Sequence, residues 1–273
     1  MVTNVLIYNM HRILIYSLYS LTCFVMTVRP YSLVFQSAMV TSILLIALIV
    51  APVSAASSPQ LPISVVKGLG AKWWQWAFSF SSDDSPLTDL RGDRCDKGDQ
   101  GKVFFLAGIA GPSASTGEPV ERTCNVAISQ KQAILIPILN AACLLTTPCA
   151  NPNESVDNMK DLQSELSALV NGVRETRATI QKEGEGVTQL DTSNSRVQTA
   201  SFKVNVAEDN PFDAPEIGFP TPAGEFRATA DGYWVLLKPL SPGTYTIHVQ
   251  GFVPQPPPAA DFVIDVTYHI TVE

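Results

Sequence analysis

Two histidines and one aspartate near the end of the sequence, His248, Asp265 and His269, are the residues best suited to chemistry. Each lies in a segment where polar and apolar residues alternate, as they do in a strand with one buried face. If both apolar faces point into the core, the three side chains share the outer face of one sheet. Two imidazoles and a carboxylate would suffice for a weak Zn or Cu site with open coordination positions, or for a protonatable pair.

No third strong metal ligand accompanies the two histidines in the sequence. We therefore favour solvated polar residues on an exposed sheet face over a metal site, and we expect no cofactor. Zn or Cu bound by His248, Asp265 and His269 remains the alternative.

Three tryptophans stand close together at Trp73, Trp74 and Trp76, in the segment GAKWWQWAFSF that covers residues 70–80. Exposed together, they could stack on sugar rings and form a ligand-binding platform. Large aromatic residues at helical spacing more often close a hydrophobic core, and we favour that interpretation. Helical spacing puts Trp73 and Trp76 on one side, so Trp74 is the residue expected to face outward.

Beyond residue 55 the chain has four cysteines: Cys95, Cys124, Cys143 and Cys149. An even number in an exported chain favours disulfides over catalytic thiols. Four cysteines allow three pairings, of which we prefer Cys95 with Cys124 and Cys143 with Cys149. Four buried free thiols are the weaker alternative in an oxidising compartment.

The motifs of common enzymes are absent from the sequence, including the nucleophile elbow, the phosphate-binding glycine loop and the zinc-protease helix. A Ser-His-Asp triad would have to use His248 or His269, and no Gly-x-Ser-x-Gly motif accompanies them. The sequence disfavours hydrolase chemistry of this type. It leaves open whether the protein is an enzyme.

Most of the segments that must position these residues are predicted strands. Apolar or alternating runs predict strands at residues 103–107, 120–128, 132–139, 201–206, 233–237, 244–250 and 262–272, and a hairpin of 175–181 with 187–190. Pro137 inside the third run indicates an edge or a bulge. The last three strands are expected to form an antiparallel meander, in which pairing about the Pro-rich loop brings His248 near Asp265.

Two helices and one long connection complete the expected architecture. Residues 70–80 predict a short aromatic helix, and apolar residues every three or four positions from residue 153 predict an amphipathic helix. Asn153 or Ser155 would cap this second helix, and Gly172 would end it in a left-handed turn. Residues 210–231, with four prolines, predict a connection. The expected fold class is mainly β, a β-sandwich or jelly-roll-like fold, with one inserted amphipathic helix and a short N-terminal aromatic helix.

The beginning of the sequence is typical of a targeting segment. Residues 1–55 contain no acidic residue, and the apolar run 43–50 is followed by the small residues that a signal peptidase reads. We expect residues 1–55 to be a signal peptide and residues 56–273 to be one exported β-rich domain. A start at Met26 would give a conventional signal, with residues 1–25 then an over-called start. Alternatively, residues 2–26 and 37–50 are two membrane segments that anchor the protein.

Charge separates the two parts of the chain. The leader carries two of the 18 Lys and Arg residues and none of the 25 Asp and Glu residues, so the exported part is acidic. This balance argues against nucleic acid as a partner. The expected partner is a glycan, a peptide or a component of the cell envelope, with membrane contact only through an uncleaved leader.

Six motifs follow one another along the chain: AKWWQWA (71–77), VFFLAG (103–108), RTC (122–124), IPILN (136–140), DGYWVLLKPLSPGTYTIHVQG (231–251) and DVTYHITV (265–272). In this order they resemble a group of uncharacterised exported microbial proteins. The resemblance implies an exported location and a shared fold, and it implies no catalytic activity.

Two classes of function follow from the sequence. The first is a non-catalytic binding or surface module of the cell envelope or the secreted milieu, which recognises a glycan, a peptide or another subunit. The second is a small metal-binding protein or metal-dependent enzyme that uses His248, Asp265 and His269. We favour the first because catalytic motifs are absent.

Overall fold

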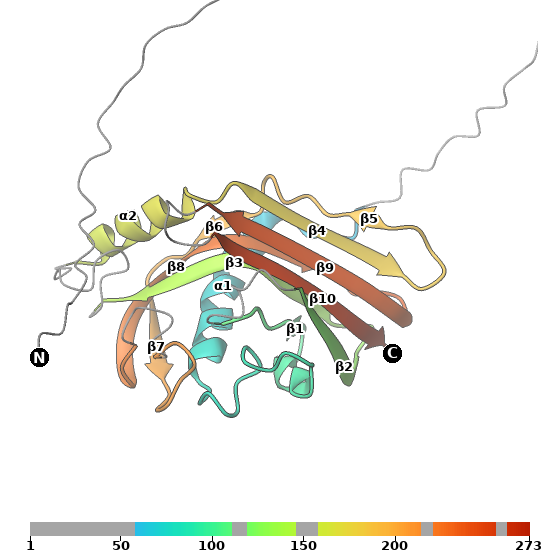
Figure 1. The fold of residues 1–273 in the computed structure, drawn as a ribbon, viewed down its shortest axis with the longest axis horizontal. Coiled ribbons are helices and arrows are strands. Elements are labelled where there is room, and N and C mark those ends of the chain that lie inside the picture. The colour runs from blue at the N-terminus through green and yellow to red at the C-terminus, as the bar shows by residue number, and fades with distance from the viewer. Residues whose placement is uncertain (1–57, 111–118, 146–157, 214–220, 255–260) are drawn as a thin grey trace, which may run out of the picture. The chain divides into compact units, whose positions relative to one another are not determined.

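The computed structural model describes residues 58–110, 119–145, 158–213, 221–254 and 261–273 (Figure 1). All described residues belong to one compact unit, Ala55–Glu273. The expected targeting segment therefore lies outside the described residues. Within the part of the chain that is described, no helix is both long enough and apolar enough to span a membrane.

Strands make up most of the regular structure, which confirms the mainly-β fold class. The elements in chain order are α1 (Ile63–Phe78), the short 3-10 helix η1 (Cys95–Gly98), β1 (Val103–Phe105), β2 (Val120–Ile128), β3 (Ala133–Leu144), α2 (Met159–Val170), β4 (Glu175–Lys182), β5 (Thr188–Gln189), β6 (Arg196–Gln198), β7 (Phe202–Val206), β8 (Gly224–Leu237), β9 (Gly243–Val253) and β10 (Phe262–Val272).

Within the described residues, the strands form two five-stranded sheets. Sheet A has the order β1-β3-β8-β6, with β7 also paired to β8, and sheet B has the order β2-β10-β9-β4-β5. The pairs β1–β3 and β2–β10 are parallel, whereas the other pairs are antiparallel. The main core lies between the sheets, where inward residues of β3 and β8 meet those of β9 and β10.

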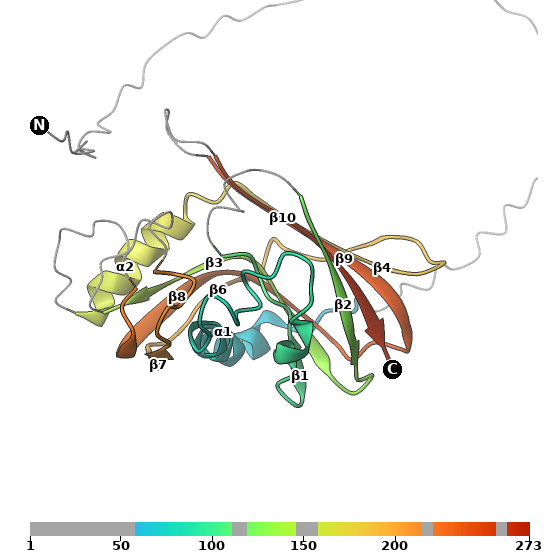
Figure 2. The same cartoon turned by 60° about the horizontal axis from the view of Figure 1, so that its bottom comes forward.

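The pattern of buried residues differs between the two sheets, because β9 and β10 bury one face whereas β3 buries both. In β9 and β10 every second residue is buried, as expected for strands with one face in the core. In β3 seven consecutive residues are buried, since sheet B covers one face and α1 covers the other. Figure 2 shows α1 on the side of β3 and β8 that is turned away from β9 and β10.

The predicted aromatic helix is confirmed, and it is longer than expected because it starts at Ile63. Val66 and the tryptophans of α1 pack with Leu135, Trp234 and Leu236 of sheet A. The helix approaches the sheet closely at Gly70, where an added Cβ would lie 3.4 Å from the Thr199 side chain and 3.8 Å from that of Trp234. Both distances are ordinary van der Waals contacts, so an alanine would fill the remaining space between the helix and the sheet.

The amphipathic helix α2 is confirmed, but its predicted ends are wrong. Asn158 caps the first turn, because its side chain accepts hydrogen bonds from the backbone N–H groups of Lys160 and Asp161. The predicted caps Asn153 and Ser155 lie outside the described residues. The helix ends at Asn171 in right-handed geometry, and Gly172 does not adopt a left-handed conformation.

Two further predictions about strands need correction, and one strand was missed. Residues 224–231 belong to β8 and not to a connection, because this polar stretch pairs with β3, β6 and β7. The strands 233–237 and 244–250 do not form a meander, since β8 lies in sheet A and β9 in sheet B. Strand β6 was not predicted. The irregularity at Pro137 is confirmed by a register shift between Pro137 and Leu139 in the pairing of β3 with β8.

Candidate functional site

The outer face of sheet B, turned away from sheet A, carries a regular array of polar side chains that we call the polar face. It is built from three neighbouring rows across the strands, each running over aligned Cα positions. The rows are Arg177–Gln250–Asp265, then Thr179–His248–Thr267–Glu121, then Gln181–Thr246–His269–Thr123. A fourth row with Phe252 and Val263 borders the first, and a fifth with Thr244 and Thr271 borders the third.

The strict alternation of the sequence produces this array. Ile247 and Val249 of β9 and Val266 of β10 are buried in the core, which turns the intervening residues outward. As predicted, His248, Asp265 and His269 therefore lie on one face of one sheet. Because the buried side of these strands is packed, their outward side chains stand on a rigid support.

The first two rows are linked by Asp265. Its carboxylate oxygen Oδ1 lies 2.8 Å from Nε2 of His248, and its Oδ2 accepts a hydrogen bond of 2.7 Å from Nε2 of Gln250. Both carboxylate oxygens thus have partners on β9. The predicted proximity of His248 and Asp265 is confirmed, by a diagonal contact, since His248 faces Thr267 directly.

His269 does not join this pair. Its Nδ1 lies 3.3 Å from the hydroxyl of Thr246, which is its direct neighbour on β9. Along β10 it is four residues from Asp265, and two residues of a strand already separate side chains by about 7 Å. Within the described ranges, no group of three His, Cys, Asp or Glu side chains is arranged to hold a metal ion.

The three tryptophans of α1 are buried in the second core, between the helix and sheet A, with exposures of 2% for Trp73, 6% for Trp74 and 8% for Trp76. The indole N–H groups of Trp73 and Trp76 donate to the carbonyls of Leu106 and Lys97. The arrangement supports the core interpretation, because a stacking platform needs open ring faces.

The prediction that Trp74 faces outward is wrong. Its ring lies 5.6 Å from that of Phe212, which follows β7 in the chain and covers the side of α1 that sequence periodicity leaves exposed. The buried indole Nε1 of Trp74 has no hydrogen-bond partner among the described residues.

The predicted disulfide between Cys95 and Cys124 is present, with 5.4 Å between the Cα atoms. It joins η1 to the edge strand β2. Cys143 is also disulfide-bonded. The predicted partner, Cys149, lies outside the described residues.

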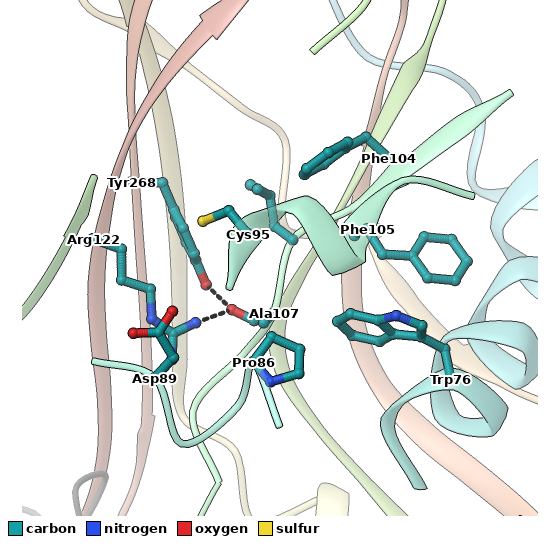
Figure 3. A pocket seen from close by; sticks show the side chains of 11 residues that line it. Trp76, Pro86, Asp89, Cys95, Phe104, Phe105, Ala107, Arg122 and Tyr268 are labelled. Atoms are coloured by element: carbon teal, nitrogen blue, oxygen red, sulfur yellow. Dashed lines mark hydrogen bonds between the residues drawn. The ribbon is translucent and has the colours of Figure 1, made fainter. Parts of the chain in front are cut away.

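A buried Arg122 is the main polar feature that the sequence interpretation missed. Its guanidinium donates to the carbonyl of Ala107 (Figure 3) and to that of Gly108. It also lies 5.9 Å from the ring of Tyr268. Tyr268 donates its hydroxyl hydrogen to the same Ala107 carbonyl. Burial lowers the pKa of Arg122 and raises that of Tyr268. The alternation of β2, in which Val120 and Cys124 point inward, was the available signal, because it also turns Arg122 inward.

Comparisons with known proteins identify no family for this chain. The chain matches no protein-family model, no curated protein and no solved structure. The functional interpretation accordingly rests on the chain's own residues, and the resemblance to exported microbial proteins stays a prediction.

Proposed function

We propose that the protein is an exported, non-catalytic binding module that recognises a glycan through the polar face of sheet B. The observation that carries this proposal is the set of three adjacent rows, which present hydroxyl, amide, imidazole and carboxylate groups at regular spacing. Such groups can donate and accept hydrogen bonds to the hydroxyl groups of a sugar chain. Because the strands are packed from behind, little conformational entropy would be lost when a ligand binds.

Charge favours a neutral ligand over an anionic one. The three rows contain one cation, Arg177, against the carboxylates of Glu121 and Asp265. The whole chain has a formal net charge of −7, which would repel a polyanion such as nucleic acid. Phe252, at one end of the polar face, adds an aromatic ring on which a sugar could pack.

Export is part of the proposal. The leader-like composition of residues 1–55 supports it, and so does the Cys95–Cys124 disulfide, since disulfides persist mainly in oxidising compartments. Intact mass spectrometry of protein recovered from the exported fraction would test this part. Protein that retains residues 1–50 would contradict removal of the leader.

Affinity electrophoresis in gels that contain starch, xylan, laminarin or galactomannan tests the ligand class. We expect at least one polysaccharide to retard the wild type, and the double variant Thr179→Val with Thr267→Val to reduce the retardation. Asn205→Ala, at an exposed position of β7 in sheet A, is the control and should behave as the wild type. No retardation by any polysaccharide, or equal retardation of all variants, would refute the proposal.

A peptide or subunit partner would give a different result in the same set of variants. If the polar face binds another copy of the chain, light scattering would show a dimer in the wild type and a monomer in Thr179→Val with Thr267→Val. That outcome would replace the glycan with a subunit.

The alternative of a metal-binding protein has one favourable observation, the 2.8 Å contact between His248 and Asp265. His269 is turned toward Thr246, which gives this alternative less support. Thermal melts with equimolar zinc or copper, before and after chelation, distinguish the two. We expect no change in melting temperature, whereas a rise lost in the variant His248→Ala with His269→Ala would establish the metal site.

A further inference from the structure

A cleft of about 310 Å³ opens between β2 and β10, next to the row of the polar face that contains His269. The pairing of the two strands explains it. Thr123 aligns with His269 and Ala127 with Thr271, so that residues 124–126 of β2 stand opposite Ile270 alone. Extra residues in one strand form a bulge, which bends that strand away from its neighbour.

Six of the ten residues that line the cleft are polar, and none of them is a lysine or an arginine. They are Thr123, Asn125, Thr244, His269, Thr271 and Glu273. A lining of hydroxyl, amide, imidazole and carboxylate groups suits a neutral, hydroxyl-rich molecule and disfavours an anion. The volume lies at the lower end of the range for small-molecule sites.

Two side chains of the lining, His269 and Asn125, have polar atoms that are available to a ligand. Nδ1 of His269 faces Thr246, and its Nε2 makes no hydrogen bond within the described residues. Asn125 is exposed, and its side-chain amide likewise has no partner there. A bound molecule could therefore use both groups without breaking a hydrogen bond of the protein.

The bulge is held in place from outside the sheet. Cys124, its first residue, is joined to Cys95 of η1, and the N–H of Thr123 donates to the carbonyl of Arg91 at 2.8 Å. Gly92 packs so closely that an added Cβ would lie 2.6 Å from the carbonyl oxygen of Thr123. A site that is rigid before binding loses less entropy when its ligand arrives.

We infer that this cleft is a subsite for a single neutral sugar ring, at the end of the glycan that the polar face would bind. The inference rests on the proposed function and deepens it. His269 belongs to both surfaces, as a member of the third row and as a wall of the cleft, and so connects them.

Saturation-transfer NMR with free glucose, galactose, mannose and N-acetylglucosamine tests the subsite. We expect one of these sugars to bind the wild type. Asn125→Ala should weaken that affinity about fivefold to tenfold, because a hydrogen bond is lost. Ala127→Trp should abolish binding, because the larger side chain fills the cleft. Both residues are exposed, so the melting temperature should stay unchanged. Asn205→Ala is the matched control.

Parallel affinity electrophoresis on the polysaccharides separates the two hypotheses. The subsite is refuted, and the proposed function stands, if a polysaccharide binds through the polar face but no monosaccharide binds. The same conclusion follows if Asn125→Ala and Ala127→Trp have no effect on monosaccharide binding. If no polysaccharide and no monosaccharide binds, both are refuted. A monosaccharide lost in Ala127→Trp and retained in Asn205→Ala supports the subsite.

Discussion

Arg196 of β6 and Asp231 of β8 form a double contact in which Nε lies 2.9 Å from Oδ1 and Nη2 lies 2.8 Å from Oδ2. The Asp231 side chain is 1% exposed. The guanidinium also donates to Asn171 and Ser167 at the end of α2. This one side chain therefore connects an edge of sheet A to the amphipathic helix.

Removal of Arg196 should leave a buried carboxylate without its cation. We expect Arg196→Ala to lower the free energy of unfolding by about 3 kcal/mol, measured by urea denaturation. Arg196→Ala combined with Asp231→Asn should recover part of the loss, because the buried charge is then gone. A single variant within about 0.5 kcal/mol of the wild type would contradict this role.

Arg122 allows a similar test with a matched control. We expect Arg122→Ala to destabilise the protein by about 3 to 5 kcal/mol, since the carbonyls of Ala107 and Gly108 lose a buried donor and a cavity remains. Arg91→Ala should change stability by less than about 0.5 kcal/mol, because the ion pair of Arg91 with Asp93 is exposed. Equal melting temperatures of the two variants would show that Arg122 is not needed for the fold.

The carboxylate of Asp89 predicts a dependence of stability on pH. Burial raises its pKa, but hydrogen bonds from the backbone N–H groups of Arg94, Gly92 and Arg91 outweigh burial and hold the pKa below its ordinary value of 3.8. A depressed folded-state pKa contributes stability above the unfolded-state pKa and loses it as pH falls through the folded-state value. We expect Asp89→Asn to flatten the decline in unfolding free energy below about pH 5. If the unfolding free energy of Asp89→Asn fell with pH as steeply as that of the wild type, the pH-dependent contribution of Asp89 would be contradicted.

The two neighbouring tryptophans of α1 should respond differently to phenylalanine. Trp73→Ala and Trp74→Ala should each cost about 3 to 5 kcal/mol, because both rings are buried. Trp73→Phe should cost more than Trp74→Phe, since only Trp73 loses a hydrogen bond, the one to Leu106. Chemical denaturation of the four variants measures these differences. If Trp74→Ala left the free energy of unfolding unchanged, the ring of Trp74 would face outward and not into the core.

Local patterns in the sequence determined the strands that carry the polar face. The predicted bounds of β2 and β10 agree with the structure, because alternation over nine to eleven residues fixes both the element and its buried side. The contact of His248 with Asp265 followed from the same alternation and the short connection between β9 and β10. A hairpin brings neighbours in sequence together, so its pairing can be inferred without knowledge of the remaining chain.

Tertiary structure alone decided which layer covers which face. Trp74 is buried because Phe212, far along the chain, packs on α1, and β8 lies in sheet A because β3 and β7 pair with it. The cleft beside His269 exists because two strands distant in sequence pair in parallel with a bulge. Periodicity indicates which side of a helix or strand is buried, but it does not indicate which other element covers that side. Contact between distant segments depends on the packing of the entire core.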